Sequence, residues 1–201
     1  MRTRFLAALL IAAAALPAAA DAQSGQWVKP PDKLPHIGGG DRTQNLDFLF
    51  GALRLAPDDI TAKAIEQRIW ALWTVSHSDT ANLLMTRVKT AIESKDLDVA
   101  IQLLDAIIKV KPDYVEAWNR RATIYYMKKD YGHALADIRE VLKREPRHFG
   151  ALAGMAQILE TTGRKQLALQ AWQKVLDLYP MQRSAQEKVS KLSEELAGEA
   201  I

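Results

Sequence analysis

Residues 112–146, PDYVEAWNRRATIYYMKKDYGHALADIREVLKREP, contain the pattern that decides the fold. Apolar residues recur every three or four positions on both sides of the polar turn KKD at 128–130, which is the period of an amphipathic helix. Pro146 ends the second segment, because proline has no backbone N–H and cannot continue a helix. The stretch therefore predicts two antiparallel helices joined by a short turn.

The same hairpin recurs at a fixed interval. Pro112, Pro146 and Pro180 lie 34 residues apart, and three alanines keep the same step: Ala100, Ala134 and Ala168. A polar turn lies in the middle of each unit, at 94–96, 128–130 and 162–164, and joins its two helical segments. Gly163 in the third turn suits the left-handed residue that ends a helix. The sequence thus predicts an all-α fold with three repeats, residues 81–114, 115–148 and 149–182.

The second unit resembles the tetratricopeptide repeat (TPR) family in its aromatic, small and proline positions. The matching residues are Trp118, Ala122, Tyr125, Tyr131, Ala134, Ile138 and Pro146. The resemblance implies an α-solenoid of stacked hairpins, with Ala122 and Ala134 where two helices cross closely. Arg87 and Arg121 depart from the family pattern, because leucine is commonest at their positions.

Both ends of the repeat region carry further helical patterns. Residues 42–80 have two apolar stripes and are expected to form a degenerate N-terminal hairpin, whereas residues 183–201 are expected to form a capping helix and tail. Trp70 and Trp73 lie three apart in the first of these regions. They either anchor a partner or, as we favour for Trp73, pack against the first full repeat.

The N-terminus has the features of a secretory signal. A short positive start precedes an apolar run from Phe5 to Leu16, and small residues allow cleavage after Ala20 or Ala22. We expect a signal peptide at 1–22, a flexible Pro- and Gly-rich linker at 23–41 and a periplasmic location. An uncleaved membrane anchor is the alternative, although the run is shorter than the ~20 residues of a typical bilayer span.

Composition narrows the function further. The formal net charge of +3 over 201 residues has no basic run on one helical face, which argues against a nucleic-acid partner. The absence of cysteine excludes disulfides, thiol catalysis and a lipid-modified cysteine. No spacing of histidines or acids suggests a metal site, no glycine-rich phosphate loop is present, and no cofactor is expected.

The TPR resemblance implies a protein or peptide partner in a concave groove lined by the first helix of each hairpin. The groove positions carried over are Asn82, Met85, Lys89, Glu93, Glu116, Asn119, Thr123, Tyr126, Met127, Gln157, Glu160 and Thr161. Met85 and Lys89 stand where chaperone-binding TPR domains carry a Lys and Asn pair, so that type of clamp is not expected. The sequence favours a scaffold for cell-envelope assembly or secretion over an enzyme.

A hydrolase is the alternative from another class of function. It would use Glu93, Lys89 and Glu116 as acid and base, if these residues came together on adjacent repeats.

Overall fold

The computed structural model describes residues 42–198, in which helices alternate with short turns. The nine helices of this part are α1 (Arg42–Arg54), α2 (Asp59–Thr74), α3 (Asp79–Glu93), α4 (Leu97–Val110), α5 (Val115–Met127), α6 (Tyr131–Arg144), α7 (Phe149–Thr161), α8 (Lys165–Leu178) and α9 (Arg183–Gly198). The expected signal peptide (1–22) and linker (23–41) lie outside the described residues.

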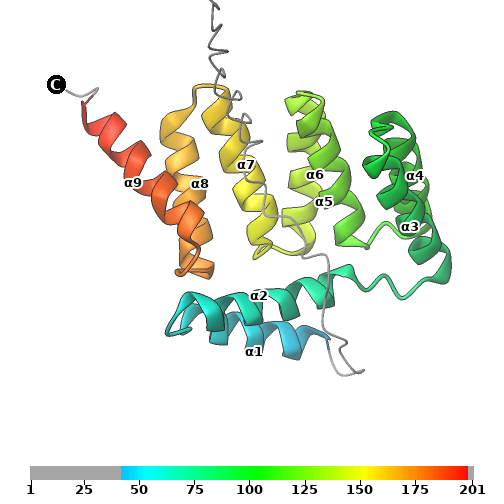
Figure 1. The fold of residues 1–201 in the computed structure, drawn as a ribbon, viewed down its shortest axis with the longest axis horizontal. Helices are drawn as coiled ribbons and strands as arrows, with labels where there is room; N and C mark the ends of the chain where they lie inside the picture. The colour runs from blue at the N-terminus through cyan, green and yellow to red at the C-terminus, as the bar shows by residue number, and fades with distance from the viewer. Residues whose placement is uncertain (1–41, 199–201) are drawn as a thin grey trace, which may run out of the picture.

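Helices α3 to α8 form three hairpins, α3/α4, α5/α6 and α7/α8, which stand side by side with α9 packed on α8 (Figure 1). Ala122 and Ala134 are fully buried in one apolar cluster, where α5 and α6 approach closely. The predicted all-α solenoid of three repeats with a capping helix is confirmed.

The turn inside each hairpin repeats one backbone conformation. Lys95, Lys129 and Gly163 have positive φ angles of 61°, 59° and 75°. The N–H of the residue after each of them donates to a carbonyl five residues earlier, at 2.8 to 2.9 Å, as from Asp130 to Tyr125. Gly163 therefore takes the left-handed conformation expected for it, and Lys95 and Lys129, at the equivalent positions of the other two units, share it.

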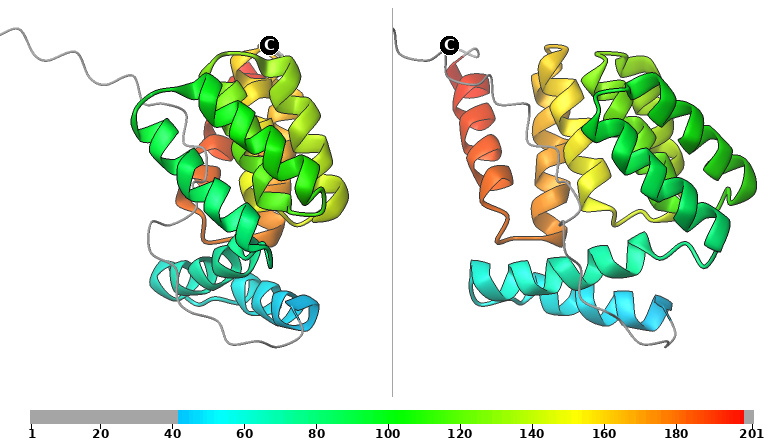
Figure 2. Two further views of the ribbon diagram at one scale, coloured as in Figure 1. Left: turned by 90° about the vertical axis from the view of Figure 1, so that its right-hand side faces the viewer. Right: turned by 45° about the vertical axis from the view of Figure 1, so that its right-hand side comes forward.

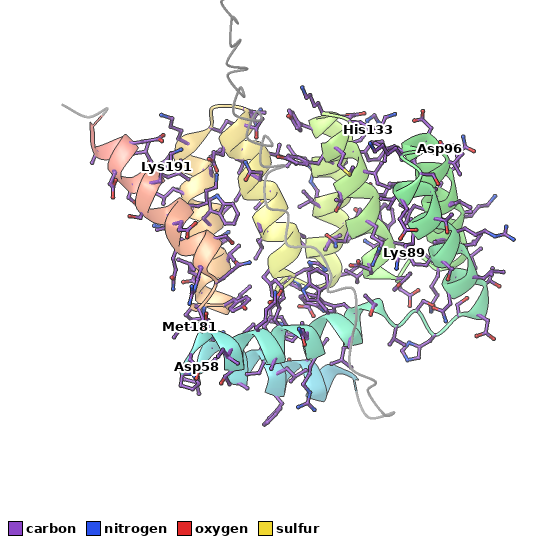
Figure 3. The ribbon with its side chains drawn as sticks, viewed as in Figure 1. Asp58, Lys89, Asp96, His133, Met181 and Lys191 are labelled. Atoms are coloured by element: carbon purple, nitrogen blue, oxygen red, sulfur yellow. The ribbon has the colours of Figure 1, made fainter. Side chains whose placement is uncertain are left out.

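The N-terminal hairpin does not continue the stack of repeats. Helices α1 and α2 pair, but they run across the ends of the other helices, along the turns that connect one repeat to the next (Figures 1 and 2). Asp58 and Met181 lie at this edge, whereas Asp96 and His133, beside the turns within hairpins, lie at the opposite edge (Figure 3).

Contacts from α1 and α2 reach three inter-repeat turns. The Tyr114 hydroxyl donates to the Thr74 carbonyl at 2.8 Å, and the Tyr179 hydroxyl lies 3.2 Å from Glu66 Oε2. Arg147 pairs with Asp47, so the middle turn is held as well. The hairpin thus braces turns that belong to different repeats.

An aromatic cluster joins the hairpin to the array. The Trp73 ring stacks on His148 with centroids 4.1 Å apart, and Phe149 packs at 5.0 Å from Trp73 and 5.6 Å from Trp70. Trp70, Trp73 and Phe149 are at most 1% exposed. The expectation that Trp73 packs against the first repeat is wrong, because the hairpin lies across the array and brings this ring to the start of α7.

His148 has two structural roles at this junction. Its Nδ1 accepts a hydrogen bond from the N–H of Ala151 at 3.1 Å and so caps α7, while its ring supports Trp73. The side chain is fully buried, and this burial lowers the pKa of His148 to about 3. The ring is therefore neutral in the folded protein at neutral and mildly acidic pH.

Replacing Gly163 with Ala should lower the free energy of unfolding by about 1 kcal/mol, because a Cβ disfavours the left-handed conformation. No atom lies within 4 Å of that Cβ, so the loss is purely conformational. Gly132→Ala, within α6 and with ordinary backbone geometry, is the matched control and should raise stability by roughly 0.5 kcal/mol. Urea denaturation followed by circular dichroism measures both.

Acid should destabilise the protein through His148. Its pKa is lower in the folded state, so the unfolded chain takes up the proton first, and stability is lost as pH falls from about 6.5 towards 3. Through His148 alone, the free energy of unfolding should fall by up to about 1.4 kcal/mol for each pH unit in this range. His148→Asn keeps a capping side chain and should flatten this dependence in urea titrations between pH 7.5 and 5; an unchanged slope would contradict the assignment.

Candidate functional site

The predicted groove residues lie on α3, α5 and α7, and we call the face that they form the inner face. Their accessibility differs widely. Asn82, Lys89, Glu93, Met127 and Thr161 are exposed, Met85, Thr123, Tyr126 and Glu160 are half-buried, and Glu116, Asn119 and Gln157 are buried. Only part of the predicted set can therefore contact a partner in this conformation.

Glu116 and Asn119, in the first two turns of α5, belong to a buried polar cluster. Asn119 Nδ2 donates to Glu116 Oε2 at 3.0 Å, Arg120 Nε lies 3.0 Å from Glu116 Oε1, and His148 Nε2 lies 3.9 Å from Glu116 Oε2. Burial raises the pKa of the Glu116 carboxyl, although the positive charge of Arg120 acts in the opposite direction. These side chains hold α5 and the start of α7 together.

Helix α2 covers the same part of the inner face on α7. Gly150 and Ala153 occupy the positions on α7 that are equivalent to Glu116 and Asn119 on α5, and both are buried. A Cβ at Gly150 would lie 2.9 Å from the Trp70 ring, so the glycine permits the close approach of α2. We call this covered part, next to α1 and α2, the proximal half of the inner face.

We call the rest of the inner face on α5 and α7, formed by Tyr126, Met127, Glu160 and Thr161, the distal half. Side chains of three helices meet there. The Thr161 hydroxyl on α7 donates to the Gln157 carbonyl at 2.8 Å and interacts with the Tyr126 phenol on α5, whose pKa is raised by burial. Lys188 on α9 pairs with Glu160 on α7 at 2.7 Å. Met127 is 52% exposed beside them. Hydroxyl, charged and thioether groups thus meet on an accessible surface.

Helix α3 continues the inner face at the other end of the array. Lys89 and Glu93 form an ion pair at 3.8 Å, and both side chains are more than half exposed, so the pair contributes little to stability and can rearrange for a ligand (Figure 3 labels Lys89). Asn82 accepts a hydrogen bond from the Ser76 hydroxyl at 2.6 Å, which ties the start of α3 to the preceding loop.

The structure separates the carboxylates of the hydrolase hypothesis. Glu93 is the last residue of α3, whereas Glu116 is the second residue of α5, at the opposite end of an equivalent helix. In the register of the repeat the two positions differ by 11 residues, about 16 Å along a helix. Glu116 is also fully buried, so these groups cannot act together on one substrate as acid and base.

The described part of the chain comprises residues 42–198. Within this part of the chain, no group of three or more His, Asp or Glu side chains is arranged to hold a metal ion. None of its helices combines the length and apolar character needed to cross a bilayer.

Sequence reasoning missed two groups that the structure brings together. His148 was only one of four scattered histidines, and Arg121 only a departure from the family pattern. In the structure Arg121 bridges Asp137 on α6 and Asp105 on α4. Aligning the three units at the 34-residue step would have exposed both positions as differences between otherwise equivalent junctions.

Comparison with known proteins agrees with this geometry. The tetratricopeptide repeat family matches residues 115–148. A TPR repeat-containing protein of Rhizobium etli is 48% identical over 155 residues, which cover 77% of this chain and 76% of that protein.

Two solved structures are similar in fold. The first TPR of Spaghetti (RPAP3), bound to an HSP90 peptide, has a TM-score of 0.56 and 20% identity, and the similarity covers 60% of this chain and 95% of that one. A double mutant of MamA has a TM-score of 0.53 and 17% identity, covering 80% and 88%. The fold is that of a protein-interaction scaffold, and the chain belongs to the tetratricopeptide repeat family.

Proposed function

We propose that this protein is an exported scaffold that holds a peptide segment of a partner protein against the distal half of its inner face, and that it supports cell-envelope assembly or secretion. The observation that carries the proposal is the division of the inner face. Trp70 and Trp73 cover the proximal half, whereas Met127 and Thr161 on the distal half are exposed.

The chemistry of the distal half suits a peptide. The exposed thioether of Met127 adapts to differently shaped apolar side chains. Thr161 and Tyr126 present hydroxyls, and the Glu160–Lys188 pair presents one charge of each sign. Such groups can bond to a peptide backbone, which has both donors and acceptors. The peptide bound to the similar Spaghetti domain supports this class of ligand.

Export rests on the leader sequence alone. The positive start, apolar run and small residues of positions 1–22 support a periplasmic location, with 23–41 as a spacer. The alternative is a membrane-tethered assembly factor that retains the apolar run. Mass spectrometry of the mature N-terminus separates the two, because a start near Gln23 supports the soluble form and a retained Met1 in the membrane fraction supports the tether.

A photo-crosslinking amino acid at Met127 or Thr161 should capture a partner in cells that produce the protein, because these positions are exposed on the distal half. The same probe at Gln102, exposed on α4, is the control and should not capture that partner. Capture from Gln102 alone would place the binding surface elsewhere.

Binding should also depend on the shape of the distal half. Thr161→Arg adds a large side chain beside Tyr126 and should abolish the crosslink from Met127, while circular dichroism of the purified variant remains that of the wild type. An undiminished crosslink in a folded variant would contradict the proposed surface.

A further inference from the structure

The two junctions between repeats have equivalent backbones but differ in the side chains that fill them. At the first junction, between α4 and α6, the Trp118 ring lies between the guanidinium groups of Arg121 and Arg144, at 5.0 and 4.9 Å from its centroid. The indole N–H and Arg144 Nε also donate to the Pro112 carbonyl, each at 3.0 Å. Three large side chains thus occupy this junction.

Ion pairs close the first junction further. Arg121 donates to both carboxylate oxygens of Asp137 at 2.7 and 2.8 Å and also pairs with Asp105 on α4. These hydrogen bonds raise the pKa of Arg121, so its charge is permanent. The junction is therefore closed by side chains of the protein itself.

At the second junction, between α6 and α8, all three large side chains are replaced by smaller apolar ones. Leu152 takes the place of Trp118, Met155 that of Arg121 and Leu178 that of Arg144, each 34 residues later. Two hollows remain, of about 380 and 450 Å³, and they share Leu142 and Met155 in their linings. We call this continuous depression the α6–α8 cleft; its lining also includes Leu135, Ile138, Arg139, Lys143, Pro146, Lys174 and Asp177.

The rim of the cleft is basic. Arg139, Lys143 and Lys174 are exposed, and none of them forms an ion pair with another of the described residues, whereas Asp177 is the one acidic residue in the lining. The equivalents of Arg139 and Lys174 one repeat earlier are the acids Asp105 and Glu140. The four charged rim positions therefore carry a net charge of +2 at the second junction, whereas their equivalents at the first, Asp105, Lys109, Glu140 and Lys143, are balanced.

We infer that the α6–α8 cleft binds an acidic amphipathic helix of a partner protein. The lining residues on α6 run from Leu135 to Lys143, which is 8 residue steps, about 12 Å, and corresponds to about two turns of a bound helix. Apolar residues on one face of that helix would cover Leu142 and Met155, as in other helix-in-groove complexes. Flanking carboxylates would pair with the unpaired basic rim.

The inference is independent of the proposed function, because none of the predicted inner-face residues lines the cleft, which lies between α6 and α8 with Leu152 and Met155 of α7 in its lining. The charge of the rim also favours a partner protein over the chain's own linker, residues 23–41. Residues 23–41 contain Lys29 and Lys33 with Asp32 and Asp41, a balanced set that does not complement a basic rim.

The test uses a fluorescein-labelled helical peptide of about 14 residues, with leucines on one face and glutamates beside them. Fluorescence anisotropy with the protein should show saturable binding that weakens at high salt. A peptide of the same composition in scrambled order, and one with lysine in place of glutamate, should bind at least tenfold more weakly.

Substitutions in the protein test whether the acidic peptide binds in the α6–α8 cleft. Lys143→Glu should weaken it roughly tenfold, and Lys109→Glu, the equivalent exposed lysine of α4, should leave it unchanged. The double variant Met155→Arg with Arg139→Asp installs at the second junction the ion pair that Arg121 and Asp105 make at the first. It should remain folded by circular dichroism and lose binding altogether.

Three results would overturn the inference: no binding of the acidic peptide, equal effects of Lys143→Glu and Lys109→Glu, or full binding by the folded double variant. Sedimentation of the protein alone provides a fourth outcome. A dimer that the double variant converts to a monomer would show that a second copy of the chain occupies the cleft. The Thr161→Arg variant should bind the peptide normally, so this inference and the proposed function can fail separately.

Discussion

The packing of Trp70 and Trp73 against the start of α7 is the contact on which the arrangement of the molecule depends. In a simple solenoid each hairpin touches only its neighbours, and nothing joins distant repeats. Here Trp73 stacks on His148, and the hairpin that carries it also contacts Tyr114 and Tyr179 in two other turns. The array therefore has a brace along one edge.

The same contact decides which surface is available for binding. Glu116 and Asn119 are buried, and Glu116 lies beside His148, on which Trp73 stacks, so these two predicted groove residues belong to the interior of the protein. The hydrogen bond from Asn119 Nδ2 to Glu116 Oε2 and the Arg120–Glu116 ion pair offset part of the cost of burying these polar groups. The distal half lies beyond the reach of the two tryptophans, and Met127 and Thr161 remain accessible there.

Because the backbone repeats, side-chain differences between equivalent positions show how one junction differs from the next. Equivalent helices place residues 34 positions apart in equivalent surroundings, so a change of side chain alters one junction without altering the backbone. Trp118 between two arginines closes one junction, and Leu152 with Met155 leaves the next open. A repeat protein can thus confine a binding surface to one part of a uniform framework.

The amino-acid sequence by itself determined the helices, their turns and the 34-residue period, because helical periodicity and the backbone effects of Pro146 and Gly163 act over a few residues. It also identified candidate inner-face positions through the TPR resemblance. Only the tertiary structure decided that Glu116 is buried, that Trp73 meets His148 and that Arg121 bridges two helices. Each of these depends on how segments distant in sequence pack together, and local pattern carries no information about which distant side chain will cover a given position.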